Sequence, residues 1–182
     1  MKAVFLDRDG VINKYPGDKK YVTSLKGFRF LPKAKKAILL LNDSGYKLFV
    51  ISNQAWVGKG VYSQKTLDAI TCRMLKEVRK EGGDIHEVNY CTHRPEMNCA
   101  CRKPRAGMIK QVKARYRKIN LKKSFFIGDT IRDVLTSEDA GCKSILVLSG
   151  KEKLRNRKNW EHEPDLVFKD LWTAARFISK GK

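Results

Sequence analysis

Short apolar runs alternate along the chain with longer stretches in which apolar residues recur every three or four positions. The short runs are rich in β-branched and aromatic residues and predict strands, while the longer stretches predict amphipathic helices. Strands are predicted at 3–6, 47–52, 87–91, 124–127 and 144–148, with a weaker one at 166–168. Helices are predicted at 33–43, 63–81, 108–118, 131–140 and 171–180. This alternation is typical of a doubly wound, Rossmann-like α/β fold, a parallel sheet with helices on both faces.

Local signals support the ends of two helices. The first stops before Gly45, a residue suited to the left-handed conformation that ends many helices. Ser63 can accept a hydrogen bond from the first turn of the next helix. Cys72 lies within the apolar pattern of that second helix and Cys142 precedes a strand, so both are predicted to be buried small residues.

Length and composition fit one globular domain that spans 1–182. A core of this size buries roughly 70% of the surface that the unfolded chain exposes, and 42% of the residues are apolar while 32% are charged. No apolar run approaches the ~20 residues that cross a bilayer, and charge follows Met1 too soon for a secretory signal. We expect a cytoplasmic monomer with no membrane partner.

The formal net charge of +20 would attract nucleic acid and anionic metabolites. Lys and Arg are spread over 33–36, 73–80, 110–123 and 151–158 rather than gathered in one arm. This distribution favours a solvated basic surface. We therefore expect a small phosphorylated metabolite as the partner, with nucleic acid as the less favoured alternative.

Acidic residues follow two of the predicted strands. Asp7 and Asp9 come after the first strand, and Asp129 and Asp133 come after the fourth. In an open α/β sheet the ligand crevice lies beyond the carboxyl ends of the strands. Asp and Gly at such places also form turns and helix caps. Taken together, however, the carboxylates would supply oxygen ligands for Mg²⁺.

A hydroxyl group and an ammonium group complete this set. Ser52 ends the second predicted strand, and Lys103 follows the third after a loop. Both side chains can hold phosphate oxygens, and a cation neutralises phosphoryl charge during transfer.

These segments together resemble the four motifs of the haloacid dehalogenase-like phosphatase superfamily, which are matched by 7–10, Ser52, Lys103 and 128–133. The resemblance implies that Asp7 attacks phosphorus while Asp9 protonates the leaving oxygen and later activates water. It also implies Mg²⁺ held by Asp7, Asp129 and the backbone carbonyl of Asp9.

The same resemblance implies further roles around the phosphate. Ser52 and Lys103 would hold its oxygens, and Asp133 would order the region between metal and lysine. We also expect Asn53 to contact the substrate.

Three cysteines and one histidine are crowded into a short segment, at Cys91, His93, Cys99 and Cys101. Three sulfurs and one imidazole can close a tetrahedral zinc site, which marks a structural metal. Their spacing differs from the usual two-residue knuckle, so free thiols are the alternative. The segment 91–105 resembles the zinc loop of a branch that includes heptose-bisphosphate phosphatases and the histidinol-phosphate phosphatase domain. These relatives lack a large cap, and we expect none here.

The stretches 7–13, 20–22, 53–60 and 102–108 favour the heptose branch. Removal of the 7-phosphate from a heptose 1,7-bisphosphate is therefore the expected reaction, with Arg102 anchoring phosphate. Trp56 stands where that branch commonly carries a small residue, and it is expected to line the pocket or to pack as a loop aromatic. The alternatives are a histidinol-phosphate phosphatase, a nucleic-acid terminal phosphatase and a non-catalytic basic binding domain.

Overall fold

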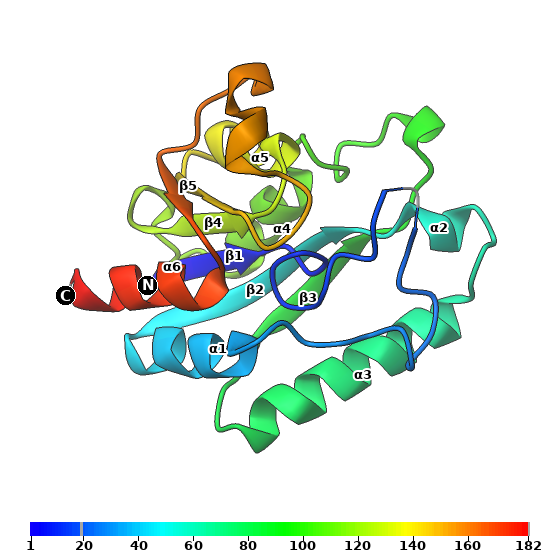
Figure 1. The fold of residues 1–182 in the computed structure, drawn as a ribbon, viewed down its shortest axis with the longest axis horizontal. Coiled ribbons are helices and arrows are strands. Elements are labelled where there is room, and N and C mark those ends of the chain that lie inside the picture. Colours follow the sequence, from blue (N-terminus) through cyan, green and yellow to red (C-terminus); the bar gives the residue numbers. More distant parts are fainter. Residues whose placement is uncertain (19, 182) are drawn as a thin grey trace.

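The computed structural model describes residues 1–18 and 20–181 (Figure 1). Its strands form one parallel sheet in the order β3-β2-β1-β4-β5-β6. Their bounds are β1 (Lys2–Leu6), β2 (Tyr46–Asn53), β3 (Glu87–Cys91), β4 (Phe125–Gly128), β5 (Lys143–Val147) and β6 (Leu166–Phe168). Each predicted strand is confirmed to within one residue, because buried parallel strands appear in a sequence as continuous apolar runs.

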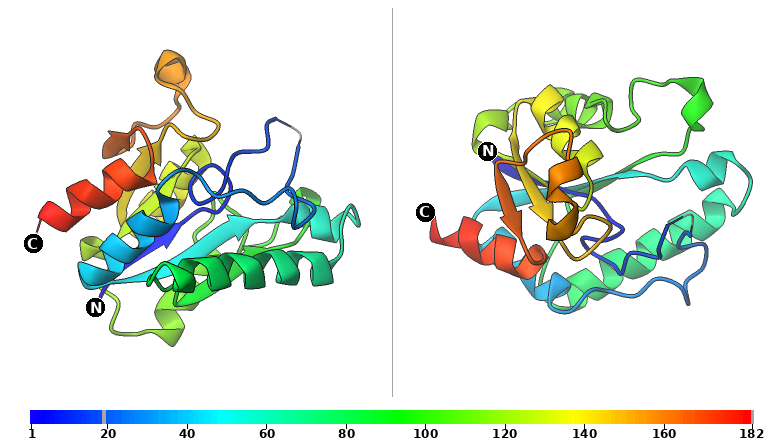
Figure 2. Two further views of the ribbon diagram at one scale, coloured as in Figure 1. Left: turned by 60° about the horizontal axis from the view of Figure 1, so that its bottom comes forward. Right: turned by 45° about the horizontal axis from the view of Figure 1, so that its top comes forward.

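Helices cover both faces of the sheet (Figure 2). One face packs against α1 (Ala34–Asp43), α3 (Gln64–Lys80) and α6 (Leu171–Lys180). The other face packs against α4 (Gly107–Arg115) and α5 (Ile131–Ala140). The one-turn helix α2 (Ala55–Gly58) and the short 3₁₀ segments at 95–97, 121–123 and 154–159 were not predicted, because they are too short to show a period.

Alternate residues of each strand enter separate halves of the core. Val4 and Leu6 of β1 face α1, α3 and α6, whereas Ala3 and Phe5 face the α4 and α5 side. This follows from the two-residue period of a strand, whose successive side chains point to opposite faces. Both halves consist mainly of buried apolar side chains, and their packing holds the strand ends in place.

The predicted end signals of two helices act as expected, whereas one of two predictions about buried cysteines fails. Ser63 caps this helix by accepting a hydrogen bond from the Thr66 backbone N–H at 3.1 Å, and Gly45 follows α1 with a φ of 82°. Cys142 is buried as predicted, but Cys72 is exposed, so that prediction was wrong. Cys72 lies two residues beyond the buried Ile70, which turns it about 200° from the apolar stripe.

The position of β1 defines where a ligand can bind. β1 lies between β2 and β4. The strands β2 and β3 extend the sheet on one side of β1, and β4, β5 and β6 extend it on the other, so the strand order reverses direction at β1. Ligands of open α/β sheets bind beyond the carboxyl ends of the strands at such a switch point. Among the described residues, no helix has the length and apolar content that a membrane span needs.

Candidate active site

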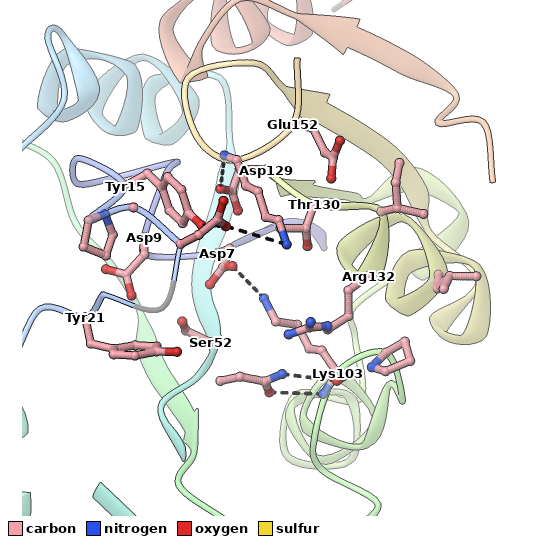
Figure 3. Close-up of a pocket in the computed structure, with 18 of the residues that line it drawn as sticks. Asp7, Asp9, Tyr15, Tyr21, Ser52, Lys103, Asp129, Thr130, Arg132 and Glu152 are labelled. Carbon is pink, nitrogen blue, oxygen red and sulfur yellow. Dashed lines mark hydrogen bonds and ion pairs between the residues drawn. The ribbon is translucent and has the colours of Figure 1, made fainter. Parts of the chain in front are cut away.

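Three buried carboxyl groups meet at the carboxyl ends of β1 and β4. Asp7 directly follows β1, while Asp129 and Asp133 follow β4, and carboxyl oxygens of the three lie within 4.8 Å of one another. Figure 3 shows the side chains of Asp7 and Asp129 in the pocket. Burial, and then the charges of Asp7 and Asp133, raise the pKa of Asp129 well above its ordinary value. A cation would relieve this repulsion, and oxygen donors suit a hard cation such as Mg²⁺.

Lys103 supplies a buried positive charge beside the cluster. Its ammonium group lies 2.8 Å from Asp7 Oδ2 and 2.5 Å from Asp133 Oδ1, and only 3% of the side chain is exposed. Burial opposes its charged form, but the two carboxylates outweigh this and raise the pKa of Lys103. Burial likewise raises the pKa of Asp7, and Lys103 opposes that shift. The lysine therefore compensates part of the negative charge on the pocket floor.

Asn53 and Asp133 hold Lys103 in place. Asn53, at the end of β2, accepts a hydrogen bond from the Lys103 backbone N–H and donates one to its carbonyl, both at 3.1 Å. Asp133 Oδ2 accepts from the Thr130 backbone N–H at 3.1 Å and from its hydroxyl at 2.7 Å, which caps the N-terminus of α5. Asp133 therefore links a helix end to Lys103.

The segment directly after β5 packs against the carboxylate cluster, and it was not predicted from the sequence. The Lys151 backbone N–H donates to Asp129 Oδ2 at 2.8 Å, and the Ser149 hydroxyl donates to the Gly10 carbonyl at 2.7 Å. A Cβ atom at Gly10 would lie 2.2 Å from Asp129 Oδ2, and one at Gly150 would lie 1.9 Å away, so only glycine fits. The position of this segment directly after a predicted strand was the signal that could have found it.

The carboxyl group of Asp9 is held by three side chains. The fully buried Arg8 donates to both of its oxygens at 2.9–3.2 Å, while Asn13 donates at 2.8 Å and Gln54 at 3.1 Å. Burial opposes ionisation of Asp9, but the Arg8 charge and these hydrogen bonds hold its pKa below the ordinary range. Its orientation is therefore fixed by neighbours rather than left to solvent.

These groups form the floor of an open cavity of about 560 Å³. Its walls come from four parts of the chain that are distant in sequence: loop residues 15–18 and 20–21, the end of β2, the turn from β4 to α5, and the segment after β5. The predicted residues that line it are Asp7, Asp9, Ser52, Asn53, Lys103 and Asp129. Further charged and aromatic lining residues, which the sequence analysis did not assign to substrate, include Tyr15, Asp18, Arg132, Lys151 and Glu152.

Two side chains that were predicted to bind substrate lie outside this cavity lining. Trp56 packs against Tyr21, with ring centroids 4.1 Å apart, and Tyr21 rather than Trp56 faces the cavity. Arg102 is partly buried, and one of its guanidinium nitrogens has no hydrogen-bond partner among the described residues. Trp56 therefore acts here as a support for Tyr21, the second of the two roles expected for it.

A second cluster brings together Cys91, His93, Cys99 and Cys101, whose ligand atoms lie within 4.8 Å of one another. The three sulfur atoms are 3.3–3.5 Å apart, and His93 Nδ1 lies 3.2 Å from the Cys101 sulfur. Although burial opposes ionisation, hydrogen bonds from the Cys101 and Cys91 thiols lower the pKa of Cys99 to about 6. Three thiols and one imidazole suit Zn²⁺ with no open position.

Comparisons with known proteins agree with this geometry. Residues 100–174 match the HAD-hydrolase-like family model. The D-glycero-β-D-manno-heptose-1,7-bisphosphate 7-phosphatase of Pseudomonas putida is 35% identical over 97% of this chain and 98% of its own. The corresponding enzyme of Photorhabdus laumondii, named for the α anomer, is 34% identical over 98% of this chain and 97% of its own.

Solved structures agree as well. The D,D-heptose 1,7-bisphosphate phosphatase of B. bronchiseptica, described as complexed with magnesium and phosphate, has a TM-score of 0.92 with 30% identity over the whole of both chains. Carboxylates and a lysine at the switch point of such a sheet define a hydrolase of phosphate esters. The chain belongs to the haloacid dehalogenase-like hydrolase family, and within that family it is a phosphatase.

Proposed function

We propose that this phosphatase removes the 7-phosphate from D-glycero-D-manno-heptose 1,7-bisphosphate. The observation that carries the proposal is similarity over nearly the whole chain to relatives that bear this name. Their names divide between the β and the α anomer. Comparison of kcat/KM for the two anomers decides which of them this phosphatase prefers.

In the proposed reaction a carboxylate oxygen of Asp7 attacks phosphorus, and the departing sugar oxygen takes a proton from Asp9. This step needs a protonated Asp9, whose pKa is held low in the free site, so the proposal requires that the bound phosphate anion raises that pKa. Water then attacks the aspartyl-phosphate while Asp9, now a carboxylate, takes its proton. This step releases inorganic phosphate and restores Asp7. The Ser52 hydroxyl and the Lys103 ammonium would hold phosphate oxygens, and the 2.8 Å contact from Lys103 to Asp7 supports this by offsetting repulsion between two anions.

We propose that Mg²⁺ binds to the carboxylates of Asp7 and Asp129 and to the backbone carbonyl of Asp9. The donors are all oxygens, and the raised pKa of the buried Asp129 indicates a need for positive charge. Bound Mg²⁺ supplies neutralisation of the charge on the phosphoryl group. Asp133 would keep its contacts with Lys103 and Thr130 and order the site from behind.

Replacing Asp129 by Asn is expected to raise the Mg²⁺ concentration needed for half-maximal activity by roughly 10- to 100-fold, because a charged ligand is lost. Activity measured against Mg²⁺ concentration gives this value. Glu161→Gln is the matched control, since Glu161 is an exposed carboxylate at the cavity wall outside the cluster. An unchanged Mg²⁺ response in Asp129→Asn would reject the ligand assignment.

We propose that Zn²⁺ occupies the cysteine cluster in a structural role. Cys101 precedes Lys103 by two residues, so a metal that orders the loop 91–105 also orders the backbone that carries the lysine. Packing supports this, because a Cβ atom at Gly107 would lie 2.2 Å from the Ala100 carbonyl oxygen. The loop is thus tightly set against the start of α4.

Cys99→Ser is expected to lose zinc, to unfold at a lower temperature, and to reduce kcat/KM by roughly 10- to 100-fold. Elemental analysis, thermal denaturation and kinetics measure the three effects. Cys72→Ser changes an exposed thiol outside the cluster and should behave as wild type. Full activity in a Cys99→Ser protein shown to lack zinc would remove zinc from the function.

The proposed substrate is tested by comparing kcat/KM for both anomers of the heptose 1,7-bisphosphate, for histidinol phosphate and for a 5′-phosphorylated oligonucleotide. We expect one heptose anomer to exceed the other substrates by at least tenfold. Higher kcat/KM for histidinol phosphate or for the oligonucleotide would overturn the substrate and leave the phosphatase class intact.

A further inference from the structure

The side-chain amide of Gln54 connects two groups of the active site that belong to different strands. Its Nε2 donates to Asp9 Oδ2 at 3.1 Å and to Ser52 Oγ at 3.2 Å. Asp9 follows β1, whereas Ser52 lies at the end of β2 and Gln54 directly after it. Gln54 and Ser52 are both buried, and Figure 3 shows Asp9 and Ser52 on the same side of the pocket. One buried side chain therefore links the loop after β1 to the end of β2.

Tyr62 fixes the direction in which the Gln54 amide faces. The buried Tyr62 hydroxyl donates to Gln54 Oε1 at 2.9 Å, so the amide oxygen faces Tyr62 and the NH₂ group faces the active site. In the reverse orientation the amide oxygen would face the Asp9 carboxylate, and two acceptors cannot share a hydrogen bond without a proton. The backbone is held as well, because the Gln54 N–H donates to the Cys91 carbonyl at 2.8 Å. Both ends of the Gln54 side chain are therefore fixed.

Gln54 differs from the other two side chains that hold Asp9. Arg8 and Asn13 belong to the same loop as Asp9, so their hydrogen bonds do not tie the carboxyl group to β2. Of the three donors, only Gln54 comes from the neighbouring strand end. A proton donor must lie within hydrogen-bond reach of the atom that receives the proton, and a displacement of about 1 Å can cost roughly 100-fold in rate. The contact from Gln54 therefore bears directly on proton transfer.

We propose that Gln54 positions the Asp9 carboxyl group for proton transfer to the leaving oxygen. The inference rests on the proposed reaction, in which Ser52 binds the transferred phosphate and Asp9 protonates the oxygen that departs from it. Because Gln54 Nε2 donates to Ser52 Oγ, the serine proton remains available to a phosphate oxygen. The same NH₂ group thereby holds the proton donor at a fixed place beside the bound phosphate. Gln54 is a positioning residue, since its effect on the reaction passes through Asp9.

The test compares two kinds of leaving group. An alkyl phosphate, such as each candidate substrate named above, needs a proton on its departing oxygen, whereas 4-nitrophenyl phosphate releases a stable phenolate that does not. The value of kcat/KM reports the steps up to release of this group. Gln54→Met should lower kcat/KM for the best of those alkyl substrates by about 10- to 100-fold more than for 4-nitrophenyl phosphate. Tyr62→Phe should lower the ratio of the two kcat/KM values by a smaller factor, because Gln54 keeps both of its acceptors.

Gln64→Met is the matched control, because Gln64 is an exposed glutamine at the start of α3 that lies outside the cavity lining. It should leave the ratio of the two kcat/KM values as in wild type. Asp9→Asn removes the proton donor itself and should lower the ratio further than Gln54→Met does. A lowered ratio in Asp9→Asn together with a wild-type ratio in Gln54→Met would overturn the role of Gln54 alone. A wild-type ratio in both variants would overturn the proposed proton transfer as well. If Gln54→Met folds poorly, Gln54→Asn, whose amide is withdrawn by one CH₂ group, decides by the same ratio.

Discussion

Asp7→Asn is expected to reduce kcat on the order of 10⁴-fold or more, because an amide cannot serve as the nucleophile that accepts the phosphoryl group. The fold should remain intact, since the two side chains have nearly the same shape. Without Mg²⁺ the variant should be at least as stable as wild type, because one of three carboxylates that crowd within 4.8 Å has lost its charge. Steady-state kinetics and thermal denaturation in the presence of a chelator measure both effects.

Asp139→Asn is the control for this variant. Asp139 is an exposed carboxylate on α5 that pairs with Lys110 outside the cavity, so its loss should leave kcat near the wild-type value. An Asp7→Asn protein with more than a few per cent of wild-type activity, after contamination by wild type is ruled out, would show that Asp7 is not the nucleophile.

Lys103→Met should lower the free energy of unfolding in metal-free buffer by about 3–5 kcal/mol, the cost of removing one partner from a buried ion pair. The ammonium group contacts both Asp7 and Asp133, and nothing of similar charge replaces it there. Turnover should also fall steeply, because phosphate oxygens lose a donor. Denaturant titration in a chelating buffer measures the stability, and added Mg²⁺ should restore part of it.

The pH dependence of the free energy of unfolding has a definite sign. Burial and the charges of Asp7 and Asp133 raise the folded-state pKa of Asp129 well above its ordinary value, so protonation of Asp129 favours the folded state. That stabilisation is fully present below about pH 4 and is lost as the pH rises through the raised pKa. The loss in free energy of unfolding caused by Lys103→Met should therefore be smaller in acid.

Lys110→Met provides the matched surface change. Its ion pair with Asp139 has a 2.8 Å contact, but the two side chains are 60% and 43% exposed. Solvent screening limits such a pair to about 1 kcal/mol or less. If both Met variants lost the same small amount of unfolding free energy, Lys103 would not be the charge that compensates the buried carboxylates.

Much of the fold was predictable because its signals are local. The strand β1 was predicted to within one residue of its observed bounds, since an apolar run that is buried on both faces is continuous in the sequence. Helices α5 and α6 were likewise predicted at their observed bounds from the spacing of their apolar residues. The error at Cys72 arose from treating a helical apolar pattern as a whole, when the facing direction changes by about 100° per residue.

The candidate site was partly predictable for a related reason. Asp7, Ser52 and Asp129 end or follow strands of one parallel sheet, and the strands of such a sheet carry their last residues to a common edge. The cysteine cluster was predictable because all four ligands lie within eleven residues, so few loop conformations are needed to bring them together.

The sequence by itself therefore determined which strands are followed by the polar residues of the site. It also determined the resemblance to a family and the identity of the residues on the cavity floor. Only the tertiary structure decided which side chains form the walls. Arg132 and Lys151 line the cavity while Arg102 and Trp56 do not. The physical reason is that a wall is built from segments far apart in the chain, and the direction of each side chain depends on loop backbone and packing that no local period records.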